Sequence, residues 1–499
     1  MAGIWSFSGR YKILHMTWFA FFLTFVVWFN FAPLSTAIKA DLGLSDPQMR
    51  TIAICNVALT VPARIIVGMV LDRFGPRITY TCLLIYAAFP CLAFALAQNF
   101  EQMVYSRLAL SIVGCGCVIG IRMVAEWFDD NEIGLAEGIY GGWGNFGSAG
   151  AAFTLPSIAA ALGFLSVGQV NWRLAIALTG LAAACYGVIY YFNVSDTPPG
   201  RVYQRPPSSA GMEVTSQRDF WFLLATNIPL VGALALIAWR LTKVDFIGSQ
   251  ALAVIGVLLV GLYLFQAYNI WQANKPLMTG AKRYAPEDRY KFSQVFNLEM
   301  AYVACFGSEL AVVSMLPTYF ERGFGLTAAA AGAVAGMYAF MNLVARPGGG
   351  LISDKLGSRK LTLVFTIAGT GLAYLLFSMF GQGIPILFVV LMTMVASFFV
   401  MAAEGATYAI VPLVKPRITG QIAGNVGAYG NVGAVVYLTV YSLLPQGVAG
   451  DRLFFQMLGC VALMVAFLNA FTLKEVTGAH AEHGVAVPAG VPVEQGDGL

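Results

Sequence analysis

Long apolar stretches alternate with short polar segments along the whole chain. About 20 consecutive apolar residues are needed to cross the hydrocarbon core of a bilayer, and stretches of that length recur at regular intervals. The pattern predicts fourteen membrane-spanning helices and therefore an all-α integral membrane protein. The predicted spans cover residues 16–38, 49–71, 78–98, 103–125, 134–163, 172–193, 219–240, 248–271, 294–320, 326–352, 361–380, 385–413, 419–445 and 453–473.

The composition agrees with a protein that is solvated by lipid. Of its 499 residues, 58% are apolar and 11% are charged, whereas a soluble domain has about 25% charged residues. The net charge of +4 is modest, and the basic residues are spread over short loops, which argues against a nucleic-acid partner.

Several classes of membrane protein are excluded because the residues they need are missing. The eight cysteines lie within apolar stretches and show no zinc-binding spacing. The three histidines, His15, His480 and His483, cannot supply paired haem ligands inside the membrane. The phosphate-binding sequence of ATP-driven pumps does not occur. We therefore expect a protein that is not by itself an ATP-driven pump and that uses no metal and no cofactor.

The loops predict an orientation in the membrane. Basic residues lie on alternate loops, which the positive-inside rule assigns to the cytoplasm together with both termini. We expect the inner membrane of a bacterium. These residues are Arg73, Arg77, Arg201, Arg205, Arg218, Lys275, Lys282, Arg283, Arg289, Lys291, Lys355, Arg359, Lys360, Lys415 and Arg417.

The chain contains an internal repeat. The pattern Ala-Arg-x-x-x-Gly-x-x-x-Asp-(Arg/Lys)-x-Gly-x-Arg begins at Ala63 and again at Ala345, a shift of 282 residues. The sequence Gly-Asn-x-Gly at 144–147 recurs at 430–433, a shift of 286 residues. The order of features is the same in both copies, so the repeat predicts two pseudo-symmetric six-helix bundles, at 1–200 and 292–474. A linker at 201–291 would hold two inserted helices, and a tail at 475–499 would be disordered.

The first repeated sequence resembles the loop motif of the major facilitator superfamily, whose transporters are built from two such halves. Its glycines allow a tight turn, and its charges can pair with helix ends and so lock one conformation. The residues of this motif are Gly68, Asp72, Arg73, Gly75 and Arg77 in the first half, and Gly350, Asp354, Lys355, Gly357 and Arg359 in the second.

Arg64 and Arg346 are expected near the middle of the membrane, one in each half. Each precedes the motif aspartate by eight residues, about 12 Å along a helix. A central charge costs about 2.5–3.5 kcal/mol, which suggests a functional role. Two guanidinium groups about 8 Å apart would repel each other by roughly 2 kcal/mol, and an anion between them would remove this repulsion. Alternatively, each arginine is a structural ion-pair partner within its own half.

The guanidinium fork suits a small planar oxyanion, and nitrate, nitrite, formate and bicarbonate all fit. Glycines near Asn145 and Asn431 recur at spacings of about three, which allows close helix packing. Packing accounts for most of these glycines. The amides of Asn145 and Asn431 could instead point into a cavity and bind the anion.

The two glycine-rich segments at 142–147 and 427–433 resemble the nitrate signatures of the nitrate/nitrite porter family, which includes the bacterial NarK-type transporters. The resemblance continues at 28–33, 127–128, 305–310 and 402–407, and it covers all twelve core helices. It implies that nitrate and nitrite are the substrates. We expect no enzymatic activity, because the sequence shows no metal cluster and no nucleophile-base pair. The insertion at 219–271 departs from the twelve-helix layout of the family and receives no role from the resemblance. The substrate-binding residues that the resemblance and the reasoning above indicate are Arg64, Arg346, Asn145, Tyr302, Phe306, Gly144, Gly147, Gly430 and Asn431.

Two glutamates make the coupling mechanism an open question. On a regular helix Tyr302, Phe306 and Glu309 fall within about 60° of one another, although rings at this spacing also fit ordinary core packing. If Glu309 or Glu404 takes up a proton, the carrier becomes a nitrate/proton symporter, which family analogy favours. If neither does, the empty carrier cannot return, and it exchanges nitrate for nitrite. Either glutamate could also be a structural partner of Arg346 or Arg122.

Two other functions stay open at this stage. One is a major facilitator carrier of another small anion such as formate. The other is a membrane sensor that binds nitrate without moving it, although the tail after Lys474 resembles no signalling domain. We expect the transporter to function as a monomer in the lipid bilayer.

Overall fold

The computed structural model describes residues 4–165, 170–205, 211–243, 246–326, 328–380, 383–445 and 447–475. These residues form helices and turns, and the described ranges contain no strand. Nearly all of the predicted tail, with His480 and His483, lies outside them. The helices are α1 (Gly9–Phe29), α2 (Ser35–Leu42), α3 (Asp46–Ala58), α4 (Thr60–Phe74), α5 (Pro76–Leu96), α6 (Phe100–Ser111), α7 (Gly116–Trp127), α8 (Ile133–Asn145), α9 (Gly147–Ala161), α10 (Trp172–Asn193), α11 (Gln217–Thr242), α12 (Ser249–Met278), α13 (Phe292–Tyr302), α14 (Ser308–Phe324), α15 (Ala328–Phe340), α16 (Asn342–Lys355), α17 (Arg359–Phe377), α18 (Ile386–Val414), α19 (Thr419–Leu443) and α20 (Val448–Thr472).

Local chain chemistry sets several helix ends. Gly75 ends α4 with a φ of 89°, a conformation that favours glycine, and Pro76 begins α5 at the position where a missing N–H costs nothing. Gly325 ends α14 with a φ of 66°. The side chains of Asn99 and Ser216 accept hydrogen bonds from the first turns of α6 and α11.

Twelve segments of the described chain are helical, long and apolar enough to cross a membrane. Ten more or less coincide with predicted core spans, and the other two are the inserted helices α11 and α12. The predicted spans 134–163 and 326–352 are each divided into two consecutive helices. Because these pieces have 13, 15, 13 and 14 residues, none reaches the roughly 20 residues that a crossing needs. The number of fourteen crossings therefore stays a prediction.

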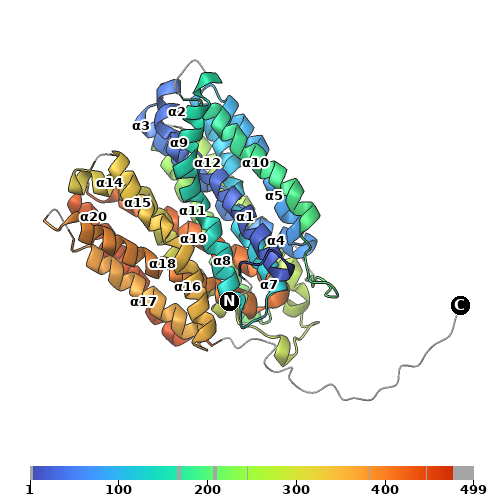
Figure 1. Ribbon diagram of the computed structural model, residues 1–499. Helices are drawn as coiled ribbons and strands as arrows, with labels where there is room; N and C mark the ends of the chain where they lie inside the picture. The colour runs from blue at the N-terminus through green and yellow to red at the C-terminus, as the bar shows by residue number, and fades with distance from the viewer. Residues whose placement is uncertain are drawn as a thin grey trace.

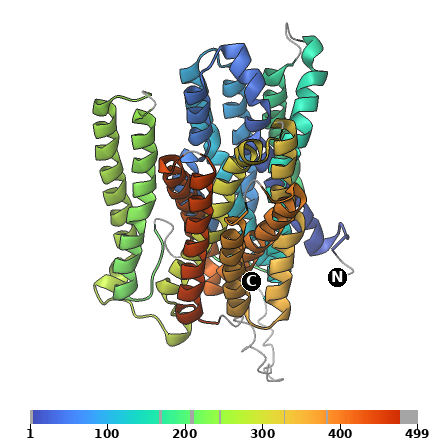
Figure 2. The ribbon, with the colours of Figure 1, turned by 90° about the vertical axis from the view of Figure 1, so that its left-hand side faces the viewer.

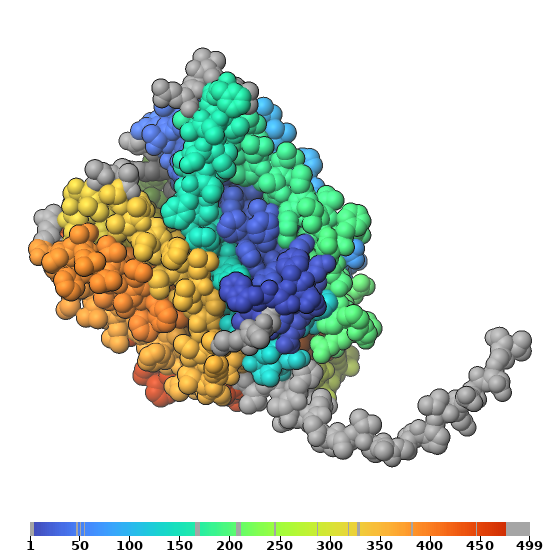
Figure 3. Space-filling view, in the orientation of Figure 1, coloured from blue at the N-terminus to red at the C-terminus, as the bar shows by residue number. Residues whose placement is uncertain are grey.

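The two sequence copies form two helical bodies that meet along crossed helix pairs. α4 of the first copy packs on α19 of the second, and α8 packs on α16. Figure 1 shows α8 and α16 side by side toward the end where the N-terminus lies, whereas α14 and α20 diverge from α3 at the opposite end. Figure 3 shows the two halves in contact in the middle and lower part of the view and separated by a notch above.

Glycines bring the paired helices close together. A Cβ atom on Gly68 would lie 2.4 Å from the carbonyl oxygen of Gly420, and one on Gly350 would lie 1.8 Å from that of Gly134. Such distances are possible only without side chains, so the backbones of α4 and α19, and of α16 and α8, touch directly. These contacts hold the halves together at one end of the molecule.

The inserted helices stand at the side of the two bundles. Figure 2 shows α11 and α12 as an antiparallel pair next to the rest of the protein. α11 packs on α19 and α13, whereas α12 packs mainly on α11 and buries only Ile270 and Asn274. The apolar side chains on the remaining surface of α12 are exposed, as expected for a helix that faces lipid.

Candidate functional site

Arg64 lies on α4, fully buried at the junction of the two halves. Its Nη1 donates to the carbonyl oxygen of Gly427 at 2.6 Å, and its Nε donates to that of Gly114 at 3.4 Å. The guanidinium group lies over the ring of Phe306, 4.9 Å from the centroid. Its Nη2 has no hydrogen-bond partner among the described residues, and no carboxylate there forms an ion pair with it. Arg64 is therefore a buried cation with a free donor.

Arg346 occupies the equivalent position on α16 but has a carboxylate partner. It forms an ion pair with Glu404 of α18. Its Nη2 also donates to the hydroxyl of Tyr302 at 3.0 Å, and its Nη1 donates to the carbonyl oxygen of Gly141 at 3.2 Å. The alternative of a structural ion pair within one half therefore describes Arg346 in this conformation, but it does not describe Arg64.

Tyr302 and Phe306 form a stacked pair of rings, with centroids 4.9 Å apart and planes 9° from parallel. Tyr302 directly precedes a π-helical turn, Val303–Gly307, and Phe306 lies within this turn, which interrupts the helix between α13 and α14. Such turns occur often at functional sites because they shift the register of the side chains. Glu309, predicted from a regular helix to share a face with the rings, is not among the residues that line their cavity, and it accepts a hydrogen bond from Asn342 at 2.9 Å.

A second pair of rings, Phe21 and Phe25 on α1, was not anticipated. Their centroids are 4.7 Å apart, and both line the same cavity as Tyr302 and Phe306. The internal repeat contained the signal, because a shift of 281 residues relates each ring of one pair to a ring of the other. The site is thus lined by one aromatic pair from each half.

Asn145 lies at the end of α8 and lines the central cavity. It is buried, and neither its amide nitrogen nor its amide oxygen has a hydrogen-bond partner among the described residues. Its counterpart Asn431 does not line the cavity and donates weakly to the carbonyl oxygen of Gly427 at 3.4 Å. The two halves therefore contribute unequally, which the repeat alone does not predict.

The predicted glycines serve packing. A Cβ atom on Gly144 would meet the ring of Phe21, and one on Gly147 would meet the carbonyl oxygen of Phe22, so both face α1 instead of the cavity. A Cβ atom on Gly430 would lie 2.6 Å from Tyr302, so this glycine makes room for the ring pair. Close contact with the backbone of α1 explains Gly147, and close contact with an aromatic ring explains Gly144 and Gly430.

Arg64, Arg346, Asn145 and both ring pairs line one buried cavity of about 10 Å³. This space accepts little more than one water-sized probe. Tyr408 also lines the cavity, and its hydroxyl has no partner among the described residues. Arginine donors, an amide and aromatic faces thus converge on a site that is closed in this conformation.

Glu137 on α8 is a further cavity residue that was not predicted from the sequence. It is buried, and both of its carboxyl oxygens lack a hydrogen-bond partner within the described chain. Of the predicted glutamates, Glu404 contacts Arg346 and also interacts with Glu309. Arg122 pairs instead with Glu126 at 2.7 Å.

The motif aspartates bind helix starts across the junction between the halves. Asp72 accepts hydrogen bonds from the N–H groups of Gly420 and Gln421 on α19, at 3.0 and 2.9 Å. Asp354 accepts them from Gly134 and Leu135 on α8, at 3.0 and 2.7 Å. A carboxylate at a helix N-terminus satisfies free N–H groups and the helix dipole. The same device therefore closes both crossed helix pairs.

The remaining motif residues fix the ends of α5 and α17. Gly75 and Gly357 have positive φ angles of 89° and 68°. The N–H of Arg77 donates to Asp196 at 2.7 Å, and burial raises the pKa of the Asp196 carboxyl. The N–H of Arg359 donates to Glu475 at 2.6 Å, and its guanidinium group pairs with Asp354 at 2.9 Å.

Arg73 and Lys355 differ from the other motif residues because their side chains point outward. Arg73 contacts the ring of Phe74, and neither residue forms an ion pair in the described ranges. Although Arg73 and Lys355 occupy equivalent positions in the internal repeat, neither takes part in the contacts that Asp72 and Asp354 make between the halves.

Comparison with known proteins assigns this architecture to a family. The sequence matches the Major Facilitator Superfamily over residues 17–293 and 298–493. It is 60% identical to the Nitrate/nitrite transporter NrtP of Picosynechococcus sp., with 96% of each chain covered. It is 54% identical to the protein of the same name from Nostoc punctiforme, covering 96% of this chain and 95% of the relative.

More distant similarities extend the comparison. The Probable nitrate/nitrite antiporter NarK1 of Thermus thermophilus is 23% identical over 93% of this chain and 92% of its own. The solved structure of the proton:xylose symporter XylE has a TM-score of 0.61 at 14% identity, covering 94% of this chain and 97% of that one. At this identity the match shows the fold alone. The protein is thus a multi-pass membrane transporter that belongs to the Major Facilitator Superfamily and, within it, to the family of nitrate/nitrite transporters.

Proposed function

We propose that this protein moves nitrate and nitrite across the membrane by alternating access. One observation carries the proposal: Arg64 is a fully buried arginine without a carboxylate partner, and its free Nη2 shares a cavity with Arg346 and with the unpaired amide of Asn145. A buried charge needs a counter-charge, and an unpaired buried amide needs a partner. A small oxyanion supplies both.

The chemistry of nitrate fits this arrangement. Its three coplanar oxygens can accept hydrogen bonds from Arg64, Arg346 and Asn145 at once. The flat faces of Tyr302 and Phe306 can exclude water from the weakly hydrated ion. Charge-assisted hydrogen bonds contribute about 1.5–3 kcal/mol each, enough for selective binding by two arginines. The names of the two cyanobacterial relatives reported above agree with this substrate.

The closed junction defines the conformational state. Asp72 and Asp354 lie at the ends of α4 and α16, next to the basic loops that the positive-inside rule places in the cytoplasm, so their contacts close the cytoplasmic end. Breaking them would let the halves rock about the central site and release the anion inward. Opening at the other end would admit the next ion.

The wider architecture follows from the same reasoning. The helix pairs α8–α9 and α15–α16 each cross the membrane as one bent segment, which makes fourteen crossings in all. Residues 1–200 and 292–474 are the two transporting halves, and 201–291 carries the inserted pair. The protein functions as a monomer in a bacterial inner membrane, with both termini in the cytoplasm.

For coupling we favour proton symport through Glu404 and Glu309. In this conformation Glu404 is the counter-ion of Arg346. A nitrate ion that binds Arg346 competes with this carboxylate, and a displaced buried carboxylate gains stability by taking up a proton. Glu309 interacts with Glu404 and has one unpaired oxygen, so it can pass the proton on. The carrier would then move nitrate and proton together.

Counterflow of labelled nitrate into proteoliposomes tests the function. We expect Arg64→Lys to raise the KM for nitrate by about tenfold or more, because lysine cannot keep the bond to Gly427 and also reach the ion. Arg107→Lys is the matched control, since Arg107 is equally buried but bonds Asn30 and Trp28 away from the cavity. Unchanged nitrate affinity in Arg64→Lys would exclude the site. If formate competes with labelled nitrate more strongly than nitrite does, the protein is a carrier of another small anion. Saturable nitrate binding without counterflow would indicate a sensor.

Coupling is tested by separating the driving forces. We expect Glu404→Gln to lose nitrate uptake driven by a pH gradient but to retain exchange of nitrate for nitrite, because the neutral amide frees Arg346 permanently. Glu309→Gln should slow the pH-driven mode in the same assay. If a nitrite gradient alone drives wild-type uptake and a pH gradient has no effect, the protein is an antiporter and our assignment is wrong.

A further inference from the structure

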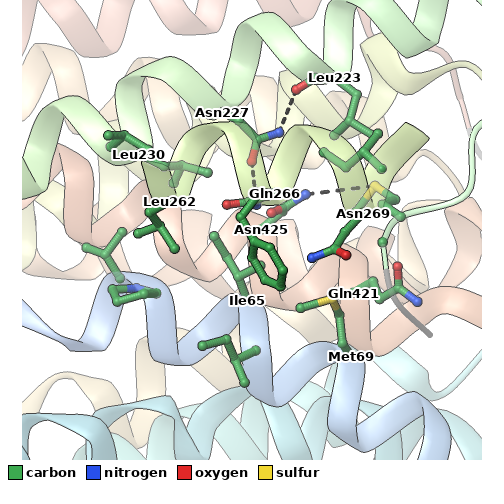
Figure 4. A pocket seen from close by; sticks show the side chains of 18 of the residues that line it. Ile65, Met69, Leu223, Asn227, Leu230, Leu262, Gln266, Asn269, Gln421 and Asn425 are labelled. Atoms are coloured by element: carbon green, nitrogen blue, oxygen red, sulfur yellow. Dashed lines mark hydrogen bonds between the residues drawn. The ribbon is translucent and has the colours of Figure 1, made fainter. Parts of the chain in front are cut away.

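A second cavity lies outside the central site, where the inserted helices meet both halves. It has a volume of about 140 Å³ and is bounded by α4, α11, α12 and α19. All four helices belong to the membrane-crossing segments. Figure 4 shows five amide side chains gathered around it, with apolar side chains such as Ile65 and Leu262 among them. The amides belong to Asn227, Gln266, Asn269, Gln421 and Asn425.

Two of these amide side chains have no hydrogen-bond partner among the described residues. Gln421 is 4% exposed, and neither its side-chain nitrogen nor its oxygen has a partner among the described residues. The half-buried side chain of Asn269 also makes no hydrogen bond in the described chain. In contrast, Gln266 donates to Asn227 at 2.6 Å. A buried amide without a partner is unfavourable, so Gln421, with Asn269 beside it in the same cavity, indicates a ligand.

The lining selects the chemistry of that ligand. An amide both donates and accepts hydrogen bonds, and a hydroxyl group can also do both. A phosphate group only accepts hydrogen bonds, and an ammonium group only donates them. Every described residue that lines the cavity is uncharged, so a charged head group would have no counter-charge there. An uncharged group with hydroxyls fits best.

The size and position of the cavity indicate a lipid. A volume near 140 Å³ is similar to that of a known protein cavity that accepts benzene, so it holds a small head group but not a whole lipid. The lining residues Phe265 and Ile66 are 62% and 53% exposed, which brings the cavity to the lipid-facing surface. Acyl chains can leave the cavity along that surface.

We propose that this cavity binds a neutral glycerolipid, with a head-group hydroxyl on Gln421 and Asn269 and the acyl chains along α4 and α12. In this proposal the inserted helices α11 and α12 form one wall of the lipid-binding site.

Binding there acts on the junction between the halves. The backbone N–H of Gln421 donates to Asp72 at 2.9 Å, so the side chain that holds the lipid belongs to a residue of the closed junction. The hydroxyl of Tyr429 on α19 donates to the carbonyl oxygen of Thr226 on α11 at 2.5 Å, which ties the inserted pair to the second half. Because α4 of the first half forms another wall, a bound lipid bridges both halves and slows their separation.

Native mass spectrometry of the full-length protein tests binding without reference to transport. We expect wild type to retain one dioleoylglycerol, and the double variant Asn269→Leu/Gln421→Leu to retain at least tenfold less. Gln272→Leu is the control, since this amide is exposed on α12 outside the cavity. A second variant, Val231→Phe, fills the cavity while leaving every amide in place, and it should also lose the lipid.

Each other outcome would overturn the proposal. Equal retention by wild type and both cavity variants would exclude the site. Preferential retention of dioleoylphosphatidylglycerol would contradict the neutral head group, and retention of no lipid by wild type would mean that water satisfies the amides.

A transport assay tests the effect on the junction. In phosphatidylcholine vesicles, added dioleoylglycerol should slow counterflow by wild type about threefold and leave the double variant unaffected. Equal slowing in both would be a bulk effect of the lipid on the bilayer and would contradict the link to Asp72. Because binding is measured without substrate, failure of the lipid site and failure of the proposed substrate are distinguishable.

Discussion

At the scale of single residues, the two central arginines reach across the molecule. Arg64 of the first half bonds the carbonyl oxygen of Gly427 in the second, and Arg346 of the second half bonds that of Gly141 in the first. A shift of 286 residues relates the two glycines, so the crossing follows the repeat. The ion pair with Glu404 breaks this symmetry and leaves Arg64 as the uncompensated charge.

Asn145 provides a test at this scale. Its buried amide is unpaired in the closed, substrate-free conformation, so Asn145→Leu should stabilise that conformation by about 1 kcal/mol, because an unpaired polar group is lost. The same change should raise the KM for nitrate by about tenfold, since the ion loses a partner. Thermal unfolding in detergent and counterflow measure the two effects. Lower stability with unchanged KM would mean that Asn145 has only a packing role.

At the scale of elements, each motif aspartate joins two helices from different halves. Asp72 binds the start of α19, and Asp354 binds the start of α8, while the glycines beside them let the backbones touch. A lost N-terminal cap costs about 0.5–2 kcal/mol, which changes a conformational equilibrium by up to about thirtyfold. The closed junction is therefore stable but can be opened by substrate-driven changes of this size.

Asp72→Asn tests the junction through a native reporter. Cys117 lines the central cavity and is buried, so it should react with a maleimide only when the cavity opens. We expect faster labelling of Cys117 in Asp72→Asn, measured by mass spectrometry of its peptide, because the amide is a weaker acceptor at the start of α19. Arg73→Gln, next to Asp72 at the end of α4 but outside the junction, should label like wild type. Equal labelling in all three proteins would remove Asp72 from the closing contact.

At the scale of the whole molecule, ligand binding and stability are linked. An anion held by both halves stabilises the folded transporter by RT ln(1 + [L]/Kd), about 2.7 kcal/mol at one hundred times Kd. We expect nitrate to raise the unfolding temperature of wild type in detergent and to have little effect on Arg64→Lys. Sulfate at the same ionic strength is the control. An equal rise with sulfate would indicate a general salt effect instead of a site.

Many of the residues that line the central cavity were predicted from the sequence. The repeat located Arg64 and Arg346, and the family resemblance added Tyr302 and Phe306, all of which the structure brings to one cavity. The glycines at 144 and 147 were assigned to the substrate, yet they pack on α1, because sequence spacing does not show which face of a helix meets which neighbour. Glu309 was predicted on the face of the rings from a uniform rotation of 100° per residue, but a π-helical turn lies between Tyr302 and Glu309, and Glu309 is not among the residues that line the cavity.

The sequence by itself determined the membrane environment, the duplication and the pair of buried cations, because apolar length, internal repetition and charge are properties of the chain before it folds. Only the tertiary structure decided that Glu404 neutralises one arginine and not the other, that Phe21, Phe25 and Glu137 complete the cavity, and that Gln421 lies between the inserted helices and the junction. These are contacts between residues far apart in the chain, and they depend on how helices pack against one another.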